Sequence, residues 1–212
     1  KDLLGYEVDE VLGKTPFDLM PAETARKAAE LFAELAVSHR HFARLEHVNL
    51  HKDGRRIVVE SSGVPIVDDA GNLLGYRGIN RDVTERKQAE EELAFERFLL
   101  TTLMDNCPDY IYFKDAQSRF LRISRVLAEH FGLADPAEAC GKTDFDFFER
   151  ARAEEAFADE QRVMQTGRPV VDKEERQVWP DGRFSWVSTS KVPLRSAAGE
   201  IVGTFGISRD IT

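Results

Sequence analysis

Cysteine is scarce in this 212-residue chain, which contains only Cys107 and Cys140. Two cysteines are too few for a disulfide framework or for a four-ligand zinc site. No apolar run approaches the ~20 residues that a membrane-spanning helix needs, and the chain does not open with a signal-peptide pattern. We therefore expect a cytoplasmic module with no membrane contact from these residues, whatever anchors the parent protein.

Basic residues are also scarce relative to acidic ones, with 29 Lys and Arg against 38 Asp and Glu and a formal charge of −9. A nucleic-acid-binding surface needs clustered Lys and Arg to replace counterions, so we expect no nucleic-acid partner. The sequence has no nucleophile elbow, no P-loop, no paired zinc motif and no phosphoacceptor context of a histidine kinase. No catalytic activity is therefore expected in these residues, although the parent protein is expected to be a kinase or a cyclic-dinucleotide enzyme.

What the chain does contain is an internal repeat at an offset of 128 residues. The segments Gly13-Lys14-Thr15, Asp53-Gly54-Arg55 and Arg81-Asp82-Val83-Thr84 recur, the last with one substitution, at 141–143, 181–183 and 209–212. Between residues 13 and 84 the two copies align without a gap, and 24 of the 72 aligned positions are identical. Because repeats are evidence of duplicated structural units, we predict two homologous domains.

Each copy has the pattern of an α+β domain. An apolar stripe at helical spacing predicts a helix over Ala22–Val37, with a counterpart over Ala151–Gln165. Asp-Gly pairs at 53–54 and 181–182 predict hairpins, and a third strand is predicted over 73–82. The second copy also has a strand-like run at 109–115, whose counterpart would lie about 19 residues before Lys1. We predict five-stranded antiparallel sheets with helices on one face, the first copy lacking its first two strands here.

The two copies are joined by a segment that predicts a long helix. The predicted division is a first domain at 1–84, a connecting helix at 85–107 and a second domain at 108–212. The first half of the helix is polar, whereas its second half carries Leu93, Leu99, Leu100, Leu103 and Met104 among other apolar residues. Two interpretations remain open: these side chains only cap the sheet of the second domain, or they also form the seam of a homodimer.

The ordered set of short motifs, present twice, resembles the PAS family of sensory domains with its PAC motif. In the first copy the resemblance is carried by Leu4-Gly5-Tyr6, Gly13-Lys14, Asp53-Gly54-Arg55, Val64-Pro65, Gly71, Gly75, Gly78 and the segment Arg81 to Lys87. It implies a tandem sensory input region of a bacterial signal-transduction protein, of the sensor histidine kinase or diguanylate cyclase/phosphodiesterase type. It also implies that Asp82 and Thr84, and likewise Asp210 and Thr212, form a signal hinge between the last strand and the following helix.

The resemblance leaves the ligand unknown. Flavin photochemistry needs a reactive cysteine near the Gly-Lys motif, where this chain has Pro16 and Asp144, so covalent flavin photochemistry is not expected. Haem is not expected either, because the long helix of the second copy has no histidine. His41, His47 and His51 share one strand face but span ~33 Å, too far for one metal. The alternatives are a ligand-free dimerisation or spacer scaffold, and after it a haem or metal redox sensor.

Candidate cavity residues follow from the same resemblance, which implies a small-molecule cavity between the helices and one face of the sheet. For the second domain the predicted lining is Phe120, Phe145, Met164, Gln177, Val187, Thr189, Phe205 and Ile207. For the first domain the equivalent mapping gives Asn49, Ser61 and Arg77. Arg77 stands out, because a buried guanidinium needs an anionic partner.

Overall fold

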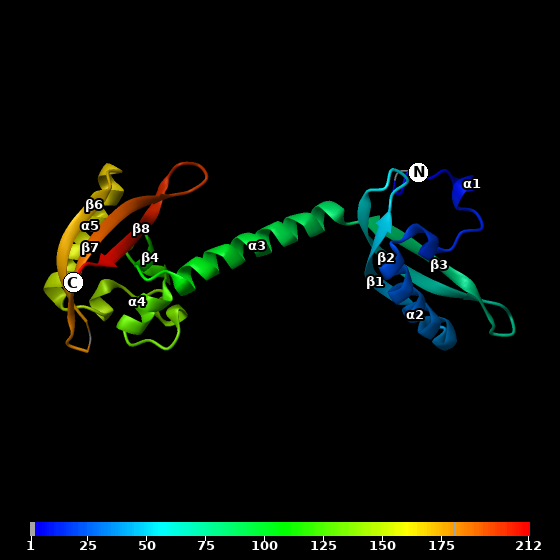
Figure 1. The fold of residues 1–212 in the computed structure, drawn as a ribbon, viewed down its shortest axis with the longest axis horizontal. Coiled ribbons are helices and arrows are strands. Elements are labelled where there is room, and N and C mark those ends of the chain that lie inside the picture. Colours follow the sequence, from blue (N-terminus) through cyan, green and yellow to red (C-terminus); the bar gives the residue numbers. More distant parts are fainter. Residues whose placement is uncertain (1–2, 180) are drawn as a thin grey trace. The chain divides into compact units, whose positions relative to one another are not determined.

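The computed structural model describes residues 3–179 and 181–212. Lys1 and Asp2, which belong to the predicted first domain, and Pro180, which flanks the predicted second hairpin, lie outside the described residues. The chain divides into two compact units, one up to Phe95 and one from Glu96 to Thr212. Each is α+β with an antiparallel sheet, which confirms the predicted fold class (Figure 1).

Unit one has three strands in the order β1-β2-β3. Its elements in chain order are α1 (Val8–Val11), η1 (Pro16–Leu19), α2 (Ala22–Ser38), β1 (Phe42–Leu50), β2 (Arg56–Val67) and β3 (Leu73–Asp82). Among the described residues no strand pairs with the outer edge of β3. Helix α3 (Thr84–Asn106) follows, close to the predicted 85–107.

Unit two has five strands in the order β5-β4-β8-β7-β6. Its elements are β4 (Tyr110–Asp115), β5 (Phe120–Ile123), α4 (Arg125–His130), η2 (Pro136–Ala139), η3 (Asp144–Asp146), α5 (Arg150–Thr166), β6 (Val170–Val178), β7 (Phe184–Arg195) and β8 (Ile201–Asp210). Short helices and α5 lie on one face of this sheet, as predicted.

The duplication extends to backbone irregularities. Arg44 (φ 53°) and Asp172 (φ 49°) are non-glycine residues with positive φ, 128 positions apart. Each lies at a bulge in its strand, and each donates its backbone N–H to a serine hydroxyl oxygen of the neighbouring strand. A positive φ is costly for a residue with a side chain, so its recurrence shows that both copies use the same strand geometry.

Aromatic side chains dominate the core of unit two. Phe131 stacks on Phe147 with ring centroids 4.1 Å apart, and Tyr110 meets Trp179 edge-on at 4.9 Å. Such pairs add to the stabilisation from apolar burial. These rings fill the space between α4, η3 and the sheet, and they also determine the walls of the cavity described next.

Candidate functional site

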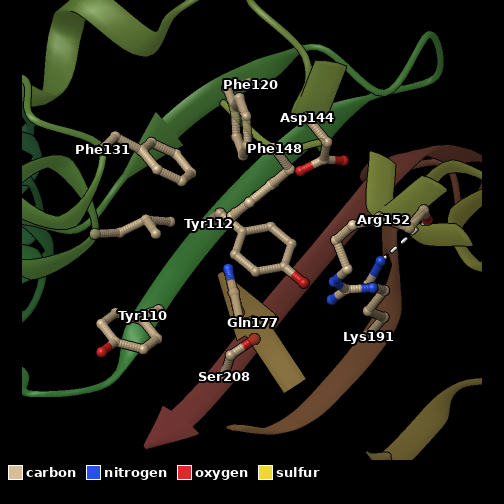
Figure 2. Close-up of a pocket in the computed structure, with 12 residues that line it drawn as sticks. Tyr110, Tyr112, Phe120, Phe131, Asp144, Phe148, Arg152, Gln177, Lys191 and Ser208 are labelled. Carbon is tan, nitrogen blue, oxygen red and sulfur yellow. Dashed lines mark hydrogen bonds between the residues drawn. The ribbon is translucent and has the colours of Figure 1, made fainter. Parts of the chain in front are cut away.

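A small cavity lies between the sheet and the helices of unit two. It measures about 30 Å³, which is room for one or two water molecules. One side is aromatic, formed by Tyr110, Tyr112, Phe120, Phe131 and Phe148 (Figure 2). The other side is polar, formed by Asp144, Arg152, Gln177, Lys191 and Ser208.

Three polar groups at this cavity have unused hydrogen-bonding capacity. Arg152 Nε is buried and has no partner among the described residues. The Gln177 amide and the Tyr112 hydroxyl, both on buried residues lining the cavity, likewise make no hydrogen bond to a described residue. Burial raises the pKa of Tyr112, so its hydroxyl keeps its proton and remains both donor and acceptor. Figure 2 shows this hydroxyl directed toward Arg152 and Lys191.

Next to the cavity lie four buried charged residues, which we call the buried charge centre: Lys114, Asp144, Glu160 and Lys191. Lys114 Nζ binds Asp144 and lies 2.7 Å from Glu160 Oε1, and Lys191 Nζ lies 3.3 Å from the same oxygen. Glu160 is fully buried and Lys114 is only 1% exposed. Two positive and two negative charges therefore balance in a place where an unpaired charge would be very costly.

The pKa of the Glu160 carboxyl reports this balance. Burial by itself raises the pKa of Glu160, but the charges of Lys114 and Lys191 and a hydrogen bond from Lys114 more than offset it. The net pKa is lowered, so Glu160 is ionised at neutral pH.

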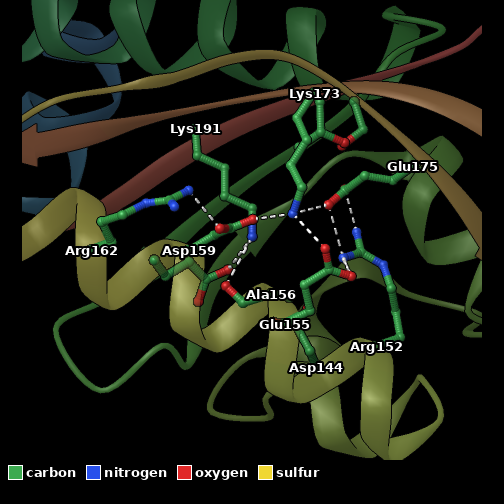
Figure 3. Close-up of polar contacts among 12 residues, drawn as sticks. Asp144, Arg152, Glu155, Ala156, Asp159, Arg162, Lys173, Glu175 and Lys191 are labelled. Carbon is green, nitrogen blue, oxygen red and sulfur yellow. Dashed lines mark hydrogen bonds and ion pairs between the residues drawn. The ribbon is translucent and has the colours of Figure 1, made fainter.

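A second, more accessible polar network connects α5 to β6. Arg152 makes a two-pronged contact to Glu175, with N–O distances of 3.1 and 2.5 Å. Lys173 lies among Glu155, Asp159 and Glu175 (Figure 3). Although partial burial opposes it, hydrogen bonds to these carboxylates raise the pKa of Lys173. The network therefore holds the Arg152 side chain in position at the cavity wall.

The predicted cavity residues of unit two are only partly brought together. Phe120 and Gln177 line the cavity. Val187 and Thr189 are buried on the same face of β7. Phe145 is half exposed, packing near Phe157, and Met164 does not line the cavity.

Phe205 and Ile207 lie on the opposite face of the sheet, so their predicted placement was wrong. In the antiparallel register of β7 and β8, Thr189 is opposite Ser208 and Lys191 is opposite Gly206. Directly opposed residues share a face, so the odd positions of β7 face the cavity together with the even positions of β8. Phe205 instead packs against Phe113, with ring centroids 4.7 Å apart.

A family model described as PAS fold matches residues 1–88 and 104–212. The chain belongs to the PAS fold family. Units one and two are its first and second PAS domains.

Among curated proteins, the chain is 27% identical over 153 residues to the methanogenesis regulatory histidine kinase FilI of Methanothrix harundinacea, covering 72% of this chain and 17% of that protein. It is 28% identical over 130 residues to a diguanylate cyclase of Vibrio cholerae, covering 60% of this chain and 40% of the cyclase. Among solved structures, VqmA bound to DPO is 28% identical with a TM-score of 0.50, covering 54% of this chain and 57% of that chain. The chain thus spans less than half the length of these two curated relatives.

The first PAS domain has a different cavity from the second. Its cavity measures about 320 Å³ and is lined by Asn49 and Ser61 together with the aromatic rings of Phe32, Phe42 and Tyr76. The Asn49 side chain is buried, and its Oδ1 has no partner among the described residues.

Arg77 lies on the other face of β3 and is exposed, so its predicted position at the cavity was wrong. The reason is the same as for Phe205: Ser61 is opposite Asn80 in the register of β2 and β3, so even positions of β3 face inward.

The buried charge centre is specific to the second PAS domain. At the offset of 128, Asp144, Glu160 and Lys191 correspond to Pro16, Phe32 and Gly63. The polar residues on the inward face of the sheet, by contrast, are similar in both domains: Gln177 and Thr189 correspond to Asn49 and Ser61. The two domains therefore share a fold but differ in the electrostatics of the cavity.

The predicted hinge residues make the same contacts in both domains. Thr84 N–H donates to Asp82 Oδ1 at 2.9 Å, and the Val58 N–H donates to the Thr84 hydroxyl at 2.9 Å. In the second domain, Thr212 N–H donates to Asp210 Oδ1 at 2.9 Å, and the Trp186 N–H donates to the Thr212 hydroxyl at 3.0 Å. In each domain the end of the last strand is thus fastened to the neighbouring strand.

Across residues 3–179 and 181–212, no group of three or more His, Cys, Asp or Glu side chains is arranged to hold a metal ion. Burial lowers the pKa of His47, which lines the first cavity as a half-buried side chain. No helix in the described part of the chain has both the length and the apolar character to span a bilayer.

The buried charge centre was missed at the level of sequence. Its members come from β4, η3, α5 and β7, which are far apart in the chain. One signal was available: Lys191 follows Val187 and Thr189 at alternate positions of a strand, so a lysine lies in the inward row. A lysine in such a row needs a buried partner, which the opposing helix supplies through Glu160.

Proposed function

We propose that these residues form the sensory input region of a signal-transduction protein of the histidine kinase or cyclic-dinucleotide enzyme type. In this proposal the second PAS domain binds a small molecule, and binding alters the Asp-x-Thr hinge at the end of its sheet. The observation that carries the proposal is the cavity lined by the buried, unpartnered Arg152 Nε together with the Gln177 amide and the Tyr112 hydroxyl. Buried polar groups are normally hydrogen-bonded, so their free capacity points to an occupant.

The chemistry of the cavity limits the occupant. Arg152 Nε, the Gln177 amide and Lys191 offer N–H donors, and the aromatic wall offers flat apolar contact. A small planar molecule carrying carbonyl, carboxylate or ring-nitrogen acceptors satisfies both sides. VqmA, a relative with a bound ligand, supports ligand binding by this fold. A ligand larger than one or two waters requires the cavity to expand from its present 30 Å³.

The same small volume favours a second candidate function, a scaffold that binds no ligand. Mass spectrometry of freshly purified protein separates the two. We expect native spectra to retain a small molecule that denaturing spectra release, with an absorption spectrum of the same sample to detect a chromophore. Gln177→Leu should lower its occupancy about tenfold, because the ligand loses a buried hydrogen bond. Gln165→Leu, at an exposed position of α5, is the matched control. A clean apoprotein mass in all three proteins would favour the scaffold.

We also propose that the chain self-associates through α3, with a second copy of the same chain as the occupant of its apolar face. Leu93, Leu100 and Leu103 are 48%, 37% and 52% exposed. Leu93 and Leu100 are seven residues apart and Leu103 follows three residues later, which is the a–a–d spacing of a helical seam. An exposed helix with large leucines at this spacing is best covered by an identical helix.

The self-association has a direct test. The double variant Leu93→Asp, Leu100→Asp is expected to weaken the dimer at least about 100-fold, because two carboxylates per chain would enter an apolar seam. Leu12→Asp, at a 70% exposed position of the first PAS domain, is expected to leave it unchanged. Sedimentation velocity over a concentration series measures both. A wild-type chain that remains monomeric, or a double variant that associates like wild type, would contradict the seam.

A further inference from the structure

A group of ionisable and aromatic side chains surrounds the end of β8 in the second PAS domain, next to the hinge. The Tyr110 ring forms part of the cavity wall (Figure 2), and its hydroxyl lies 3.2 Å from His130 Nε2. Both rings contact Trp179, with centroids 4.9 and 4.6 Å away. The Asp210 carboxylate, which accepts the hinge hydrogen bond from Thr212, interacts with both Tyr110 and His130.

The hydrogen-bond partners of His130 determine its tautomer. Its Nδ1 lies 2.8 Å from the carbonyl oxygen of Val126, which can only accept, so Nδ1 carries a hydrogen. In the neutral ring Nε2 is therefore an acceptor, and the Tyr110 hydroxyl donates to it. A proton added from solvent at Nε2 makes that nitrogen a donor. The Tyr110 oxygen then becomes the acceptor, and the phenolic hydrogen must find another partner.

Asp210 is the acceptor available to that hydrogen. Burial, together with the charge of Asp210, raises the pKa of Tyr110 to about 12, so the phenol keeps its hydrogen. Hydrogen bonds from Thr212 are the main cause that lowers the pKa of Asp210, which stays ionised between pH 5 and 8. A hydrogen bond from Tyr110 to Asp210 would compete with the one from Thr212 N–H.

The other charged groups near this cluster do not take the place of Asp210. Asp181, in the β6–β7 turn, also interacts with His130, but its side chain binds Arg183 at 2.6 Å. Asp181 is ionised, since its pKa is lowered first of all by the Arg183 N–H. Glu129, on the same helix as His130, is exposed.

We propose that His130 is a proton-sensing residue of the second PAS domain, and that its protonation turns the Tyr110 hydroxyl from His130 to Asp210 and so alters the Thr212 hinge. The effect of this change on signalling rests on the proposed function, in which the hinge transmits. Because the Tyr110 ring is also part of the cavity wall, a cavity occupant and a proton would act on the same residue.

Nuclear magnetic resonance of the 24.0 kDa chain tests the proposal with protons as the only probe. We expect the imidazole signals of His130 and the amide signals of Ile211 and Thr212 to shift with one common midpoint between pH 5 and 8, the range in which histidines change charge. The amide of Thr84 is a control within the same molecule. It donates to Asp82 as Thr212 does to Asp210, but the counterpart of Trp179 in the first domain is His51.

Two variants separate the proposed change of the Tyr110 hydrogen bond from general effects of pH on the protein. Tyr110→Phe keeps the ring and removes the hydroxyl. The imidazole signals of His130 should still shift with pH in this variant, whereas the pH-dependent shift of the Thr212 amide signal should be lost. His130→Gln should abolish both. Three results would each overturn the proposal. The Thr212 amide signal could still shift with pH in either variant, or it could stay constant in the wild type while the His130 signals shift. The His130 signals could also show no shift between pH 5 and 8. None of these outcomes bears on whether the cavity binds a ligand, which mass spectrometry decides independently.

Discussion

Replacing Glu160 with Gln is expected to lower the free energy of unfolding of the second PAS domain by about 3–5 kcal/mol. Glu160 Oε1 is shared by Lys114 and Lys191, at 2.7 and 3.3 Å, and all three side chains are at most 3% exposed. The neutral amide leaves two buried ammonium groups facing a single carboxylate, that of Asp144. Removing one partner of a buried ion pair costs far more than the pair itself contributes, because the remaining charge is no longer compensated.

The two tryptophans of the chain make this measurement specific. Both Trp179 and Trp186 lie in the second PAS domain, so tryptophan fluorescence during urea unfolding follows that domain alone. Glu155→Gln is the matched control, because Glu155 is 54% exposed and pairs with Lys173 at the surface. Glu155→Gln should lower the free energy of unfolding by less than about 1 kcal/mol. Equal losses of unfolding free energy in the two variants would show that Glu160 is not required to compensate the buried charges of Lys114 and Lys191.

The same carboxylate predicts a pH dependence with a definite sign. The pKa of Glu160 is lowered in the folded protein, so its contribution is fully present above the unfolded value of about 4.3 and is lost as the pH falls through the folded value. The tryptophan-monitored stability of the wild type should therefore decline below about pH 4.3 more steeply than that of Glu160→Gln, which has no proton to take up at this position.

The sequence alone predicted the fold well because local signals and the repeat agreed. The Asp-Gly pairs gave both hairpins, where Gly54 and Gly182 have φ of 91° and 83°, and an apolar stripe gave α2. The cavity was harder to predict. The resemblance to the PAS family assigned Gln177 and Thr189 to the inward face. The inward face of β8, however, depends on its register with β7, which no local pattern contains. Phe205 and Arg77 were therefore assigned to the wrong face.

A second large effect is expected when the whole buried charge centre is removed together. The quadruple variant is Lys114→Met, Asp144→Pro, Glu160→Leu, Lys191→Met. Its free energy of unfolding should not show the loss expected for Glu160→Gln, and should lie between the wild-type value and about 4 kcal/mol above it. The first PAS domain already folds with Pro16 and Phe32 at two of these positions. Proline suits the first position of η3, because the Asp144 N–H donates no backbone hydrogen bond among the described residues and Thr143 is extended.

The outcome of this variant decides why the second domain has Asp144, Glu160 and Lys191 where the first has Pro16, Phe32 and Gly63. If the quadruple variant is as unstable as Glu160→Gln, the charges are part of what holds α5 on the sheet. If it is stable but no longer retains a small molecule in native mass spectra, the centre serves the cavity. Lys191 is then needed as a donor beside Gln177, and Glu160 and Asp144 are needed as the ion-pair partners of the two lysines. The cavity geometry, with Lys191 on its wall and Glu160 behind it, favours the second result.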